Sequence, residues 1–357
     1  MEIPLTHPYY TAIADIPTYM TVIALLQSDG KITVGESTPL LGYSWESPAK
    51  VWEFVKAKGK ELAGRDSREA YNSLTPYQSS SPFSTTPLLT ALEAMDPSWS
   101  TLPAGLKGEV PLVGILNVRH QEEIPEYLSR LFEEGYETIK IKVGFQVEED
   151  IQKVKKAQEL VGRRALIRID ANQGYSFEEA LQFVGSVDPG NIELFEQPFP
   201  EDQWDTMRGF APHSPLPLML DESIYDERDI QKARDWGCAH FIKLKLMKAG
   251  SMQRLMEMGR KVIESGFKLV IGNGISTDVG CYHEALVFLR LQLKTAGELN
   301  GFLKVKSPLF QTPLQVERGK ILLKAAQSFQ VDMEKIERFT VEKAEWRVGH
   351  RRKTEKG

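Results

Sequence analysis

From residue 110 onward the sequence alternates short apolar runs with amphipathic stretches, and this alternation constrains the fold more than any other feature. Segments with helical periodicity separate runs that have the length and β-branched content of strands. The expected strands are 110–116, 138–143, 165–170, 192–196, 216–221, 240–245, 268–273 and 299–303. We predict a parallel β/α barrel whose outer face is covered by helices. A doubly wound open sheet is the alternative, although no Gly-x-Gly-x-x-Gly motif follows an early strand.

The regions before and after this alternation have a different character. A turn signal at Asp29-Gly30 predicts an antiparallel hairpin over residues 18–36, helical periodicity covers 48–63 and 88–95, and 77–84 has the composition of a polar loop. Near the carboxyl end we expect a short strand pair within 308–323 and a helix over 331–338. We therefore expect an α+β region at 1–108, a barrel at 109–308, and a segment 309–357 that returns to the first region.

Composition excludes several classes of protein. The net charge of −5 argues against a nucleic-acid partner. Cys238 and Cys281 form neither a disulfide framework nor a zinc-ligand pattern. No run of apolar residues is long enough to span a membrane, and the amino terminus lacks the pattern of a secretory signal peptide. We expect a cytoplasmic protein that binds neither nucleic acid nor membrane.

Three of the expected strands end in a carboxylate, namely Asp170, Glu196 and Asp221. Active sites of β/α barrels lie at the carboxyl ends of the strands. Each carboxylate alone could be a helix N-cap. Three on neighbouring strands repel one another unless a cation lies among them, and carboxylate oxygens favour Mg²⁺, with Mn²⁺ as the alternative. The pattern therefore predicts a metal site formed by these three residues.

Two lysine pairs accompany the carboxylates, Lys140 and Lys142 on the expected second strand and Lys243 and Lys245 on the sixth. Alone, such a pair is typical of a solvated sheet face. Strands two and six face each other across an eight-stranded barrel, so Lys142 and Lys245 are expected to approach a metal-bound substrate from opposite sides. Burial and a neighbouring like charge both lower the pKa of a lysine. We predict that these two lysines are acid/base catalysts that move the proton α to a carboxylate, the metal stabilising the resulting enediolate.

These residues resemble the enolase superfamily, specifically its muconate-lactonizing subgroup. The matching segments are IKIKVG at 139–144, RIDANQGY at 168–175, LFEQP at 194–198, LDES at 220–223 and IKLKLMKAG at 242–250. The resemblance implies a modified TIM (β/α) barrel under an α+β capping domain made from the amino-terminal region and the carboxyl-terminal tail. It also implies Mg²⁺ on the three carboxylates, the two lysines as catalysts, hydrogen-bonding support from Asn172, and a homo-oligomer.

The subgroup contains racemases, dipeptide epimerases, cycloisomerases and a succinylbenzoate synthase, so the resemblance leaves the reaction open. A racemase or epimerase is the first expectation. A lyase of the o-succinylbenzoate synthase or acid-sugar dehydratase kind is the second, with Lys245 remaining cationic, and a cycloisomerase is the third. A binding protein that has lost catalysis is disfavoured, because all three carboxylates and both lysines are present.

Substrate choice is expected to depend on cap loops at 9–18 and 40–46, on Lys140 and on Asn273 at the end of the seventh strand. Dipeptide epimerases of this family carry an Asp-x-Asp pair after strand eight that holds the substrate's ammonium. Lys304 and Lys306 are assigned to that place here, which predicts a small carboxylate substrate with a second anionic group. Two exposed loop lysines are the alternative. The seventh strand end has no histidine, so a His–Asp base of the mandelate-racemase type is not expected.

Overall fold

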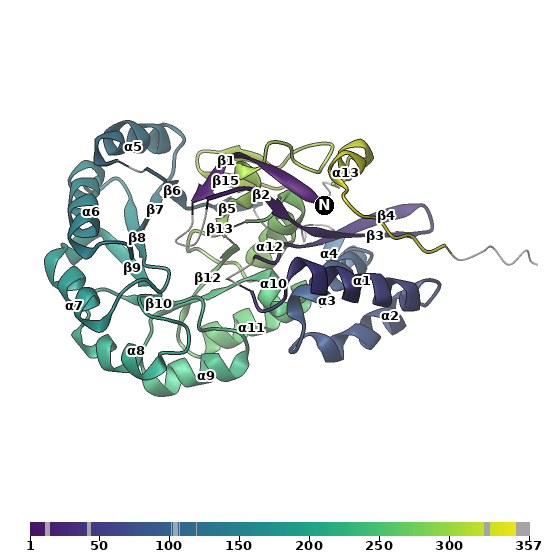
Figure 1. Ribbon diagram of the computed structural model, residues 1–357, viewed down its shortest axis with the longest axis horizontal. Helices are drawn as coiled ribbons and strands as arrows, with labels where there is room; N and C mark the ends of the chain where they lie inside the picture. The colour runs from purple at the N-terminus through teal and green to yellow at the C-terminus, as the bar shows by residue number, and fades with distance from the viewer. Residues whose placement is uncertain are drawn as a thin grey trace, which may run out of the picture.

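The computed structural model describes residues 1–10, 15–40, 44–100, 102, 106, 108–118, 120–273, 275–324 and 329–347. Its main feature is one curled sheet of eight parallel strands that follow one another in chain order (Figure 1). The strands are β6 (Gly114–Leu116), β7 (Thr138–Lys142), β8 (Leu166–Asp170), β9 (Ile192–Glu196), β10 (Leu218–Leu220), β11 (Phe241–Leu244), β12 (Lys268–Asn273) and β13 (Glu298–Leu299). A parallel bridge between Leu112 and Gly297 joins the two edges. The strand order never reverses, so the doubly wound alternative is wrong.

Helices cover the outside of the sheet (Figure 1). They are α5 (Ile124–Glu133), α6 (Val147–Val161), α7 (Phe177–Ser186), α8 (Trp204–Phe210), α9 (Glu227–Trp236), α11 (Met252–Glu264) and α12 (Asp278–Arg290). The short helix α10 (Leu246–Ala249) packs instead against the amino-terminal region. Helix α6 shows why these segments take this place. It buries Val147, Ile151, Val154 and Val161 at helical spacing, so one face packs on the sheet and the other meets solvent.

Two predicted strands differ from the structure. Residues 110–116 form two strands, because β5 (Glu109–Pro111) pairs antiparallel with β15 (Lys320–Leu322) and only β6 joins the parallel sheet. The expected eighth strand at 299–303 is also misplaced. Strand β13 ends at Leu299, and the 3-10 helix η5 (Gly301–Lys304) follows. At Gly301 an added Cβ would lie 2.5 Å from the Ser276 backbone nitrogen, so only glycine allows the chain to turn here.

The amino-terminal region combines two hairpins with a helical layer. The hairpin predicted over 18–36 is present as β3 (Val22–Ser28) and β4 (Lys31–Ser37), turning at Asp29 and Gly30 with positive φ. A second hairpin, β1 (Glu2–Tyr10) with β2 (Asp15–Met20), was not expected. The helices are α1 (Pro48–Leu62), α2 (Ser67–Leu74), α3 (Pro82–Glu93) and α4 (Pro97–Ser100). Helix α3 therefore begins inside the segment 77–84 that was expected to be a loop.

Buried carboxylates attach this region to the loops that follow the barrel strands. Glu36 of β4 accepts hydrogen bonds from the backbone N–H groups of Thr277 and Gly280, where α12 begins. Glu93 of α3 accepts from the N–H groups of Met252 and Gln253 at the start of α11, and its burial raises the pKa of Glu93 to about 7. These contacts hold the amino-terminal region at the carboxyl ends of the strands. The cap-loop residues 11–14 and 41–43 lie outside the described residues.

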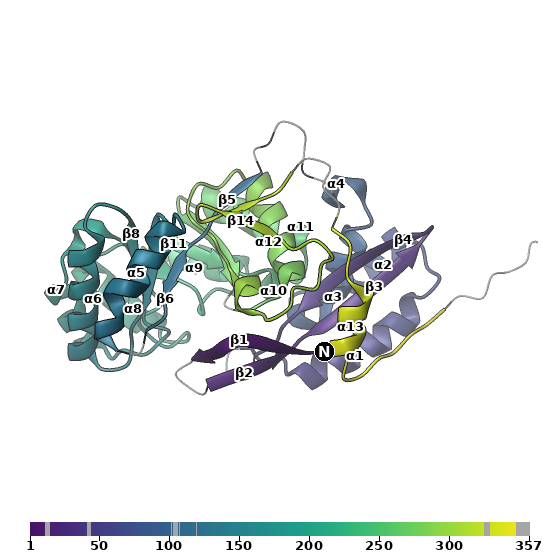
Figure 2. The same cartoon turned by 90° about the horizontal axis from the view of Figure 1, so that it is seen from above.

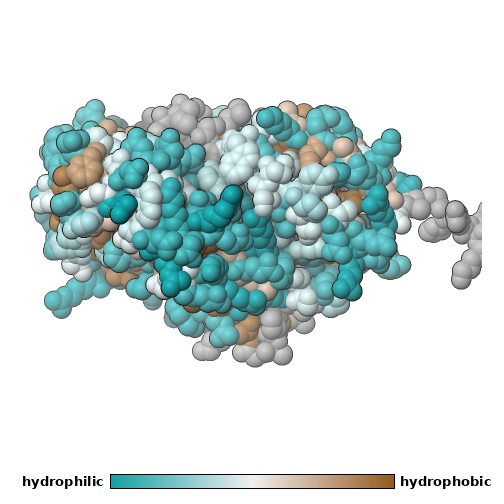
Figure 3. Space-filling view, turned by 90° about the horizontal axis from the view of Figure 1, so that it is seen from below, coloured by the Kyte–Doolittle hydropathy of each residue, from teal (hydrophilic) through white to brown (hydrophobic). Residues whose placement is uncertain are grey.

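The carboxyl-terminal segment packs on the amino-terminal region. Strands β14 (Gln315–Glu317) and β15 form the expected strand pair. Helix α13 (Met333–Phe339) lies close to the amino terminus in both views (Figures 1 and 2). Beyond it, the ring of Trp346 lies so close to Gly59 of α1 that an added Cβ there would be 2.6 Å from a ring atom. Among the described helices, none has the length and apolar character that crossing a membrane requires. The face in Figure 3 is largely hydrophilic, with scattered apolar side chains.

Candidate active site

A cavity opens at the carboxyl ends of the barrel strands, beneath the amino-terminal region. Thr38, Leu40, Ser44 and Phe83 contribute to its wall from the amino-terminal region. The barrel contributes Ile115, Lys140, Lys142, Asp170, Asn172, Asp221, Glu222, Lys243, Lys245, Met247, Lys248, Asn273, Ile275, Glu298, Asn300 and Lys304. The barrel side of the cavity is therefore densely charged, and the amino-terminal region adds two apolar and two polar side chains.

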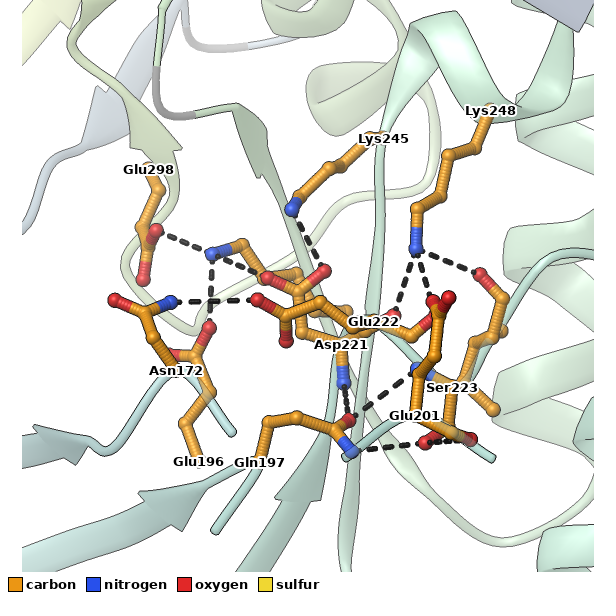
Figure 4. A network of polar contacts seen from close by, with 12 residues as sticks. Asn172, Glu196, Gln197, Glu201, Asp221, Glu222, Ser223, Lys245, Lys248 and Glu298 are labelled. Atoms are coloured by element: carbon orange, nitrogen blue, oxygen red, sulfur yellow. Dashed lines mark hydrogen bonds and ion pairs between the residues drawn. The ribbon is translucent and has the colours of Figure 1, made fainter. Parts of the chain in front are cut away.

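Two lysines and two glutamates form a closed square of ion pairs at this floor. The Lys140 Nζ lies 2.7 Å from Glu196 Oε2 and 2.7 Å from Glu298 Oε1. The Lys243 Nζ lies 3.0 Å from Glu196 Oε1 and 2.5 Å from Glu298 Oε2. Each glutamate thus binds both lysines, one through each oxygen. We call these four residues the charged square; Figure 4 shows its two glutamates among the neighbouring polar side chains.

The two aspartates of the predicted metal site lie at the edge of the charged square. Asp170 Oδ2 is 2.8 Å from Lys140 Nζ, and Asp221 Oδ2 is 3.2 Å from Lys243 Nζ. The other oxygen of Asp221, Oδ1, is 2.8 Å from the Nζ of Lys245 (Figure 4). All three predicted carboxylates are therefore neighbours around two ammonium groups, and the predicted catalytic lysine Lys245 contacts Asp221 directly.

Burial and the neighbouring charges together raise the pKa values of Lys243, Glu196 and Lys245. Burial alone would lower the pKa of Lys243, but Asp221, Glu196 and Glu298 raise it well above its usual value. Burial and the nearby Asp170 raise the pKa of Glu196 to about 8. The pKa of Lys245 is also raised, because the attraction of Asp221 outweighs burial and the repulsion of Lys243. The expected lowering of the Lys245 pKa is therefore wrong for the protein without a metal. A divalent cation at Asp221 would act in the opposite sense.

Several residues that hold the site together were not expected. The Lys248 ammonium donates to the backbone carbonyls of Asp221, Glu222 and Ile224, at 3.0, 3.1 and 3.2 Å, and so fixes the loop after β10 (Figure 4). The Asn172 side chain donates to Glu222 Oε1 at 3.3 Å, and its supporting role stays a prediction. Lys248 lies inside the IKLKLMKAG segment, so its sequence position was a usable signal. Glu298 escaped notice because strand eight was placed one residue too late.

Most of the predicted site residues meet at this cavity. Lys140, Lys142, Asp170, Asn172, Asp221, Lys245, Asn273 and Lys304 line it, and Glu196 lies fully buried at its floor. Lys306 does not belong to it. Its side chain is exposed, and its backbone N–H donates to the carbonyl of Pro4.

Because β13 ends at Leu299, the residues that correspond to the Asp-x-Asp pair lie earlier in the chain than expected. Glu298, the first residue of β13, and Asn300, which directly follows this strand, have that spacing, and both line the cavity. Lys304 lies further on, in η5. The assignment of the pair to Lys304 and Lys306 is therefore wrong in register, although Lys304 itself faces the cavity.

The donor atoms suit a hard divalent cation, but the carboxylates are paired with lysines. Within the described ranges, no three His, Cys, Asp or Glu side chains are grouped as the ligands of a metal would be. The ammonium groups of Lys140 and Lys243 lie between them instead. Asp221 Oδ1 is buried without a hydrogen bond, despite its ion-pair distance to Lys245. An all-oxygen set with such an unsatisfied carboxylate oxygen fits Mg²⁺ or Mn²⁺ chemically.

The fold and the site together define a β/α-barrel protein with a charged pocket at the carboxyl ends of its strands. A family model described as enolase C-terminal domain-like matches residues 123–332. The chain therefore belongs to this family, and the resemblance to the enolase superfamily is confirmed.

Racemases and epimerases are among the proteins that this chain is similar to. The N-succinyl-L-Arg/Lys racemase of Bacillus cereus is 26% identical over 234 residues, which cover 65% of this chain and 63% of that protein. The L-Ala-D/L-Glu epimerase of Bacillus subtilis is 26% identical over 301 residues, covering 78% and 80%. The chain thus spans less than two thirds of the first relative and four fifths of the second.

Solved structures share the fold over almost the whole chain. Muconate lactonizing enzyme from Pseudomonas fluorescens has a TM-score of 0.86 at 23% identity, covering 95% of this chain and 96% of its own. A dipeptide epimerase from Enterococcus faecalis, complexed with Mg and the dipeptide L-Leu-L-Tyr, has a TM-score of 0.84 at 21% identity and covers 92% and 96%. At these identities the likeness concerns the fold.

Proposed function

We propose that this protein is a Mg²⁺-dependent racemase or epimerase, with Mn²⁺ as the alternative ion, that acts at the carbon α to a carboxylate. One observation carries the proposal. Lys142 on β7 and Lys245 after β11 line one cavity from strands four apart, and Asp170, Glu196 and Asp221 come from the three strands between them. The racemases and epimerases among its relatives support this reading.

In this proposal each residue type has one task. Asp170, Glu196 and Asp221 would hold the divalent cation, which supplies positive charge for the substrate carboxylate and for the negative charge that develops there as the α-proton leaves. Lys142 and Lys245 move the proton. One lysine removes it from one face of the α-carbon and the other returns a proton to the opposite face, which inverts the configuration. Lys140, already paired with Asp170 and Glu196, keeps the carboxylates in place.

The three-part organisation belongs to the same proposal. Residues 1–108 form a cap, 109–308 the catalytic barrel, and 309–357 a segment that completes the cap. The contacts of Glu36 and Glu93 with the barrel and of Trp346 with α1 support it. In a cytoplasmic enzyme of this kind, the cap closes the cavity over a small substrate and keeps water from the reacting carbon.

Elimination is the second candidate, and one observation favours it. Lys245 is ion-paired with Asp221 at 2.8 Å, and this contact raises its pKa. A lysine that remains cationic suits a lyase, in which Lys142 alone transfers the proton. The two reactions differ in product mass, because elimination of water lowers the mass of the substrate and racemisation does not change it.

Replacing Lys304 with glutamate is expected to impair substrates that carry a second anionic group. Lys304 of η5 lines the cavity, as do the apolar side chains of Phe83 and Met247. Reversing a charge at the rim makes the site repel an anion. We expect KM for an N-succinyl amino acid to rise about tenfold, with little change for a neutral N-acyl amino acid, in steady-state assays.

Lys306→Glu is the matched control for this prediction. It introduces the same charge two residues away, but Lys306 is exposed and outside the cavity. Its KM values should remain those of the unmodified protein. Equal effects of the two variants, or equal effects of Lys304→Glu on both kinds of substrate, would show that Lys304 does not select a distal anion.

A further inference from the structure

The charged square contains two residues to which the proposed reaction assigns neither proton transfer nor binding of the cation. The reaction requires Lys142 and Lys245 to move the proton and Asp170, Glu196 and Asp221 to hold the cation. Lys243 and Glu298 belong to neither group, yet both are buried, with side chains 3% and 5% exposed. Burying an ammonium and a carboxylate costs free energy unless they are closely paired, so this pair calls for an explanation.

The position of the charged square in the barrel is itself unusual. The interior of a β/α barrel is filled by layers of four side chains from alternate strands, usually Val, Ile and Leu. Lys140, Glu196, Lys243 and Glu298 come from β7, β9, β11 and β13, which are alternate strands of the sheet. They therefore form one complete layer in which every member is charged. An apolar cluster of Leu194, Met219, Phe241 and Val270 is buried in the same barrel.

Lys243 and Glu298 act on the predicted metal ligands with opposite sign. The Nζ of Lys243 contacts two of those ligands directly, Glu196 at 3.0 Å and Asp221 at 3.2 Å, and so offsets their negative charge. Glu298 carries the same negative charge as the three ligands and therefore repels them. Glu298 forms ion pairs with Lys140 and Lys243, and its negative charge offsets part of the positive charge that these lysines place beside the ligands.

We propose that Lys243 and Glu298 form a matched charge pair that sets the affinity of Asp170, Glu196 and Asp221 for the divalent cation. Lys243 weakens binding of the cation, Glu298 strengthens it, and together they leave the ligands nearly as negative as they would be without either. The pair also keeps the carboxylates apart and ordered before a cation arrives. This inference rests on the proposed metal-dependent function and extends it to two positioning residues that do not touch the substrate's reacting atoms.

The test compares Mn²⁺ and Mg²⁺ binding by calorimetry in four forms of the protein. Partners of metal ligands usually change affinity by about 10- to 100-fold when they are replaced. We expect Lys243→Met to lower Kd by about tenfold or more, Glu298→Gln to raise it by a similar factor, and the double variant to bind nearly as the unmodified protein does. Thermal unfolding without metal should show both single variants less stable than the double variant, because each leaves a buried charge unpaired.

Exposed charges provide the control. Lys320 and Glu109 form an ion pair at 3.2 Å between β15 and β5, away from the cavity. Lys320→Met and Glu109→Gln alter net charge in the same way and should leave Kd unchanged. If Lys243→Met does not fold, adding it to the Glu298→Gln variant still measures the effect of Lys243, and Kd should then fall.

Two results would overturn the inference in distinguishable ways. If the protein binds Mn²⁺ and the two single variants shift Kd in the same direction, or neither shifts it, the matched charge pair is wrong while the proposed function stands. If the unmodified protein binds neither Mn²⁺ nor Mg²⁺, the proposed metal dependence fails together with this inference.

Discussion

Lys142→Ala and Lys245→Ala should each reduce racemisation by at least about 100-fold, the lower end of the usual contribution of a general acid or base. Both lysines line the cavity that contains the carboxylates. Alanine removes the amine without adding bulk, so the substrate still enters. We expect kcat to fall in both variants with a much smaller change in KM, measured by polarimetry of the product.

The two lysines should also be separable by the enantiomer that each one serves. In deuterated water, the variant that lacks the lysine facing a given enantiomer should lose exchange of the α-proton of that enantiomer. The other enantiomer can still exchange through the remaining lysine. Lys306→Ala, at an exposed position outside the cavity, should behave as the unmodified protein. Full racemase turnover in either cavity variant would contradict the two-base mechanism, and turnover lost only in Lys142→Ala would leave Lys142 as the sole residue that transfers the proton.

Removing a single carboxylate charge from the predicted metal site should abolish cation binding. Glu196→Gln and Asp221→Asn keep the size of the side chain and take away one negative charge. Both residues are buried within 3.2 Å of the Lys243 ammonium group. Each variant therefore leaves part of the Lys243 charge uncompensated and makes the site less attractive to a cation. We expect Kd for Mn²⁺ to rise by at least about 100-fold, more than for partners of ligands, and turnover to be lost.

Glu201→Gln is a suitable control for these variants. Glu201 lies on the loop that follows β9, is exposed, and accepts a hydrogen bond from the Tyr225 hydroxyl outside the cavity. It should keep its affinity for Mn²⁺. Retained activity of the Glu196 and Asp221 variants after dialysis against a chelator would show that the reaction does not require the ion.

Much of the barrel could be predicted because its segments carry strong local signals. Helices α6 and α9 occupy stretches between the expected strands where helical segments were predicted, since their apolar residues recur at helical spacing. Strands β8 and β9 end at Asp170 and Glu196 as expected. There an apolar run meets a carboxylate, and the change of residue type marks the boundary.

The missed elements depend on contacts between distant parts of the chain. Strand β1 contains two prolines and no regular alternation, and its place is determined by pairing with β2 and by a bridge from Leu5 to Val305. Strand β13 has only two residues, so its register comes from β12 rather than from its own sequence. Because this register could not be predicted, Glu298 was not recognised as a residue of the site.

The charged square shows the same limit within the site. The two Lys-x-Lys pairs and the strand-end carboxylates were correctly located at one rim. Which ammonium meets which carboxylate depends on the radius and stagger of the barrel, which no local pattern encodes. Lys140 and Lys243 consequently turned out to be tightly bound to carboxylates, and Lys245 has a raised pKa rather than the lowered one expected.

The most direct test of the central claim is deuterium incorporation by the unmodified protein in deuterated water with Mg²⁺. The substrates should include N-succinyl and other N-acyl amino acids, dipeptides and dicarboxylates, analysed by mass spectrometry and chiral chromatography. We predict that at least one substrate gains a single deuterium at its α-carbon and appears in both configurations, and that a chelator stops both changes. Inversion without deuterium incorporation, or exchange that continues unchanged after the chelator, would contradict a pair of lysines acting beside a divalent cation.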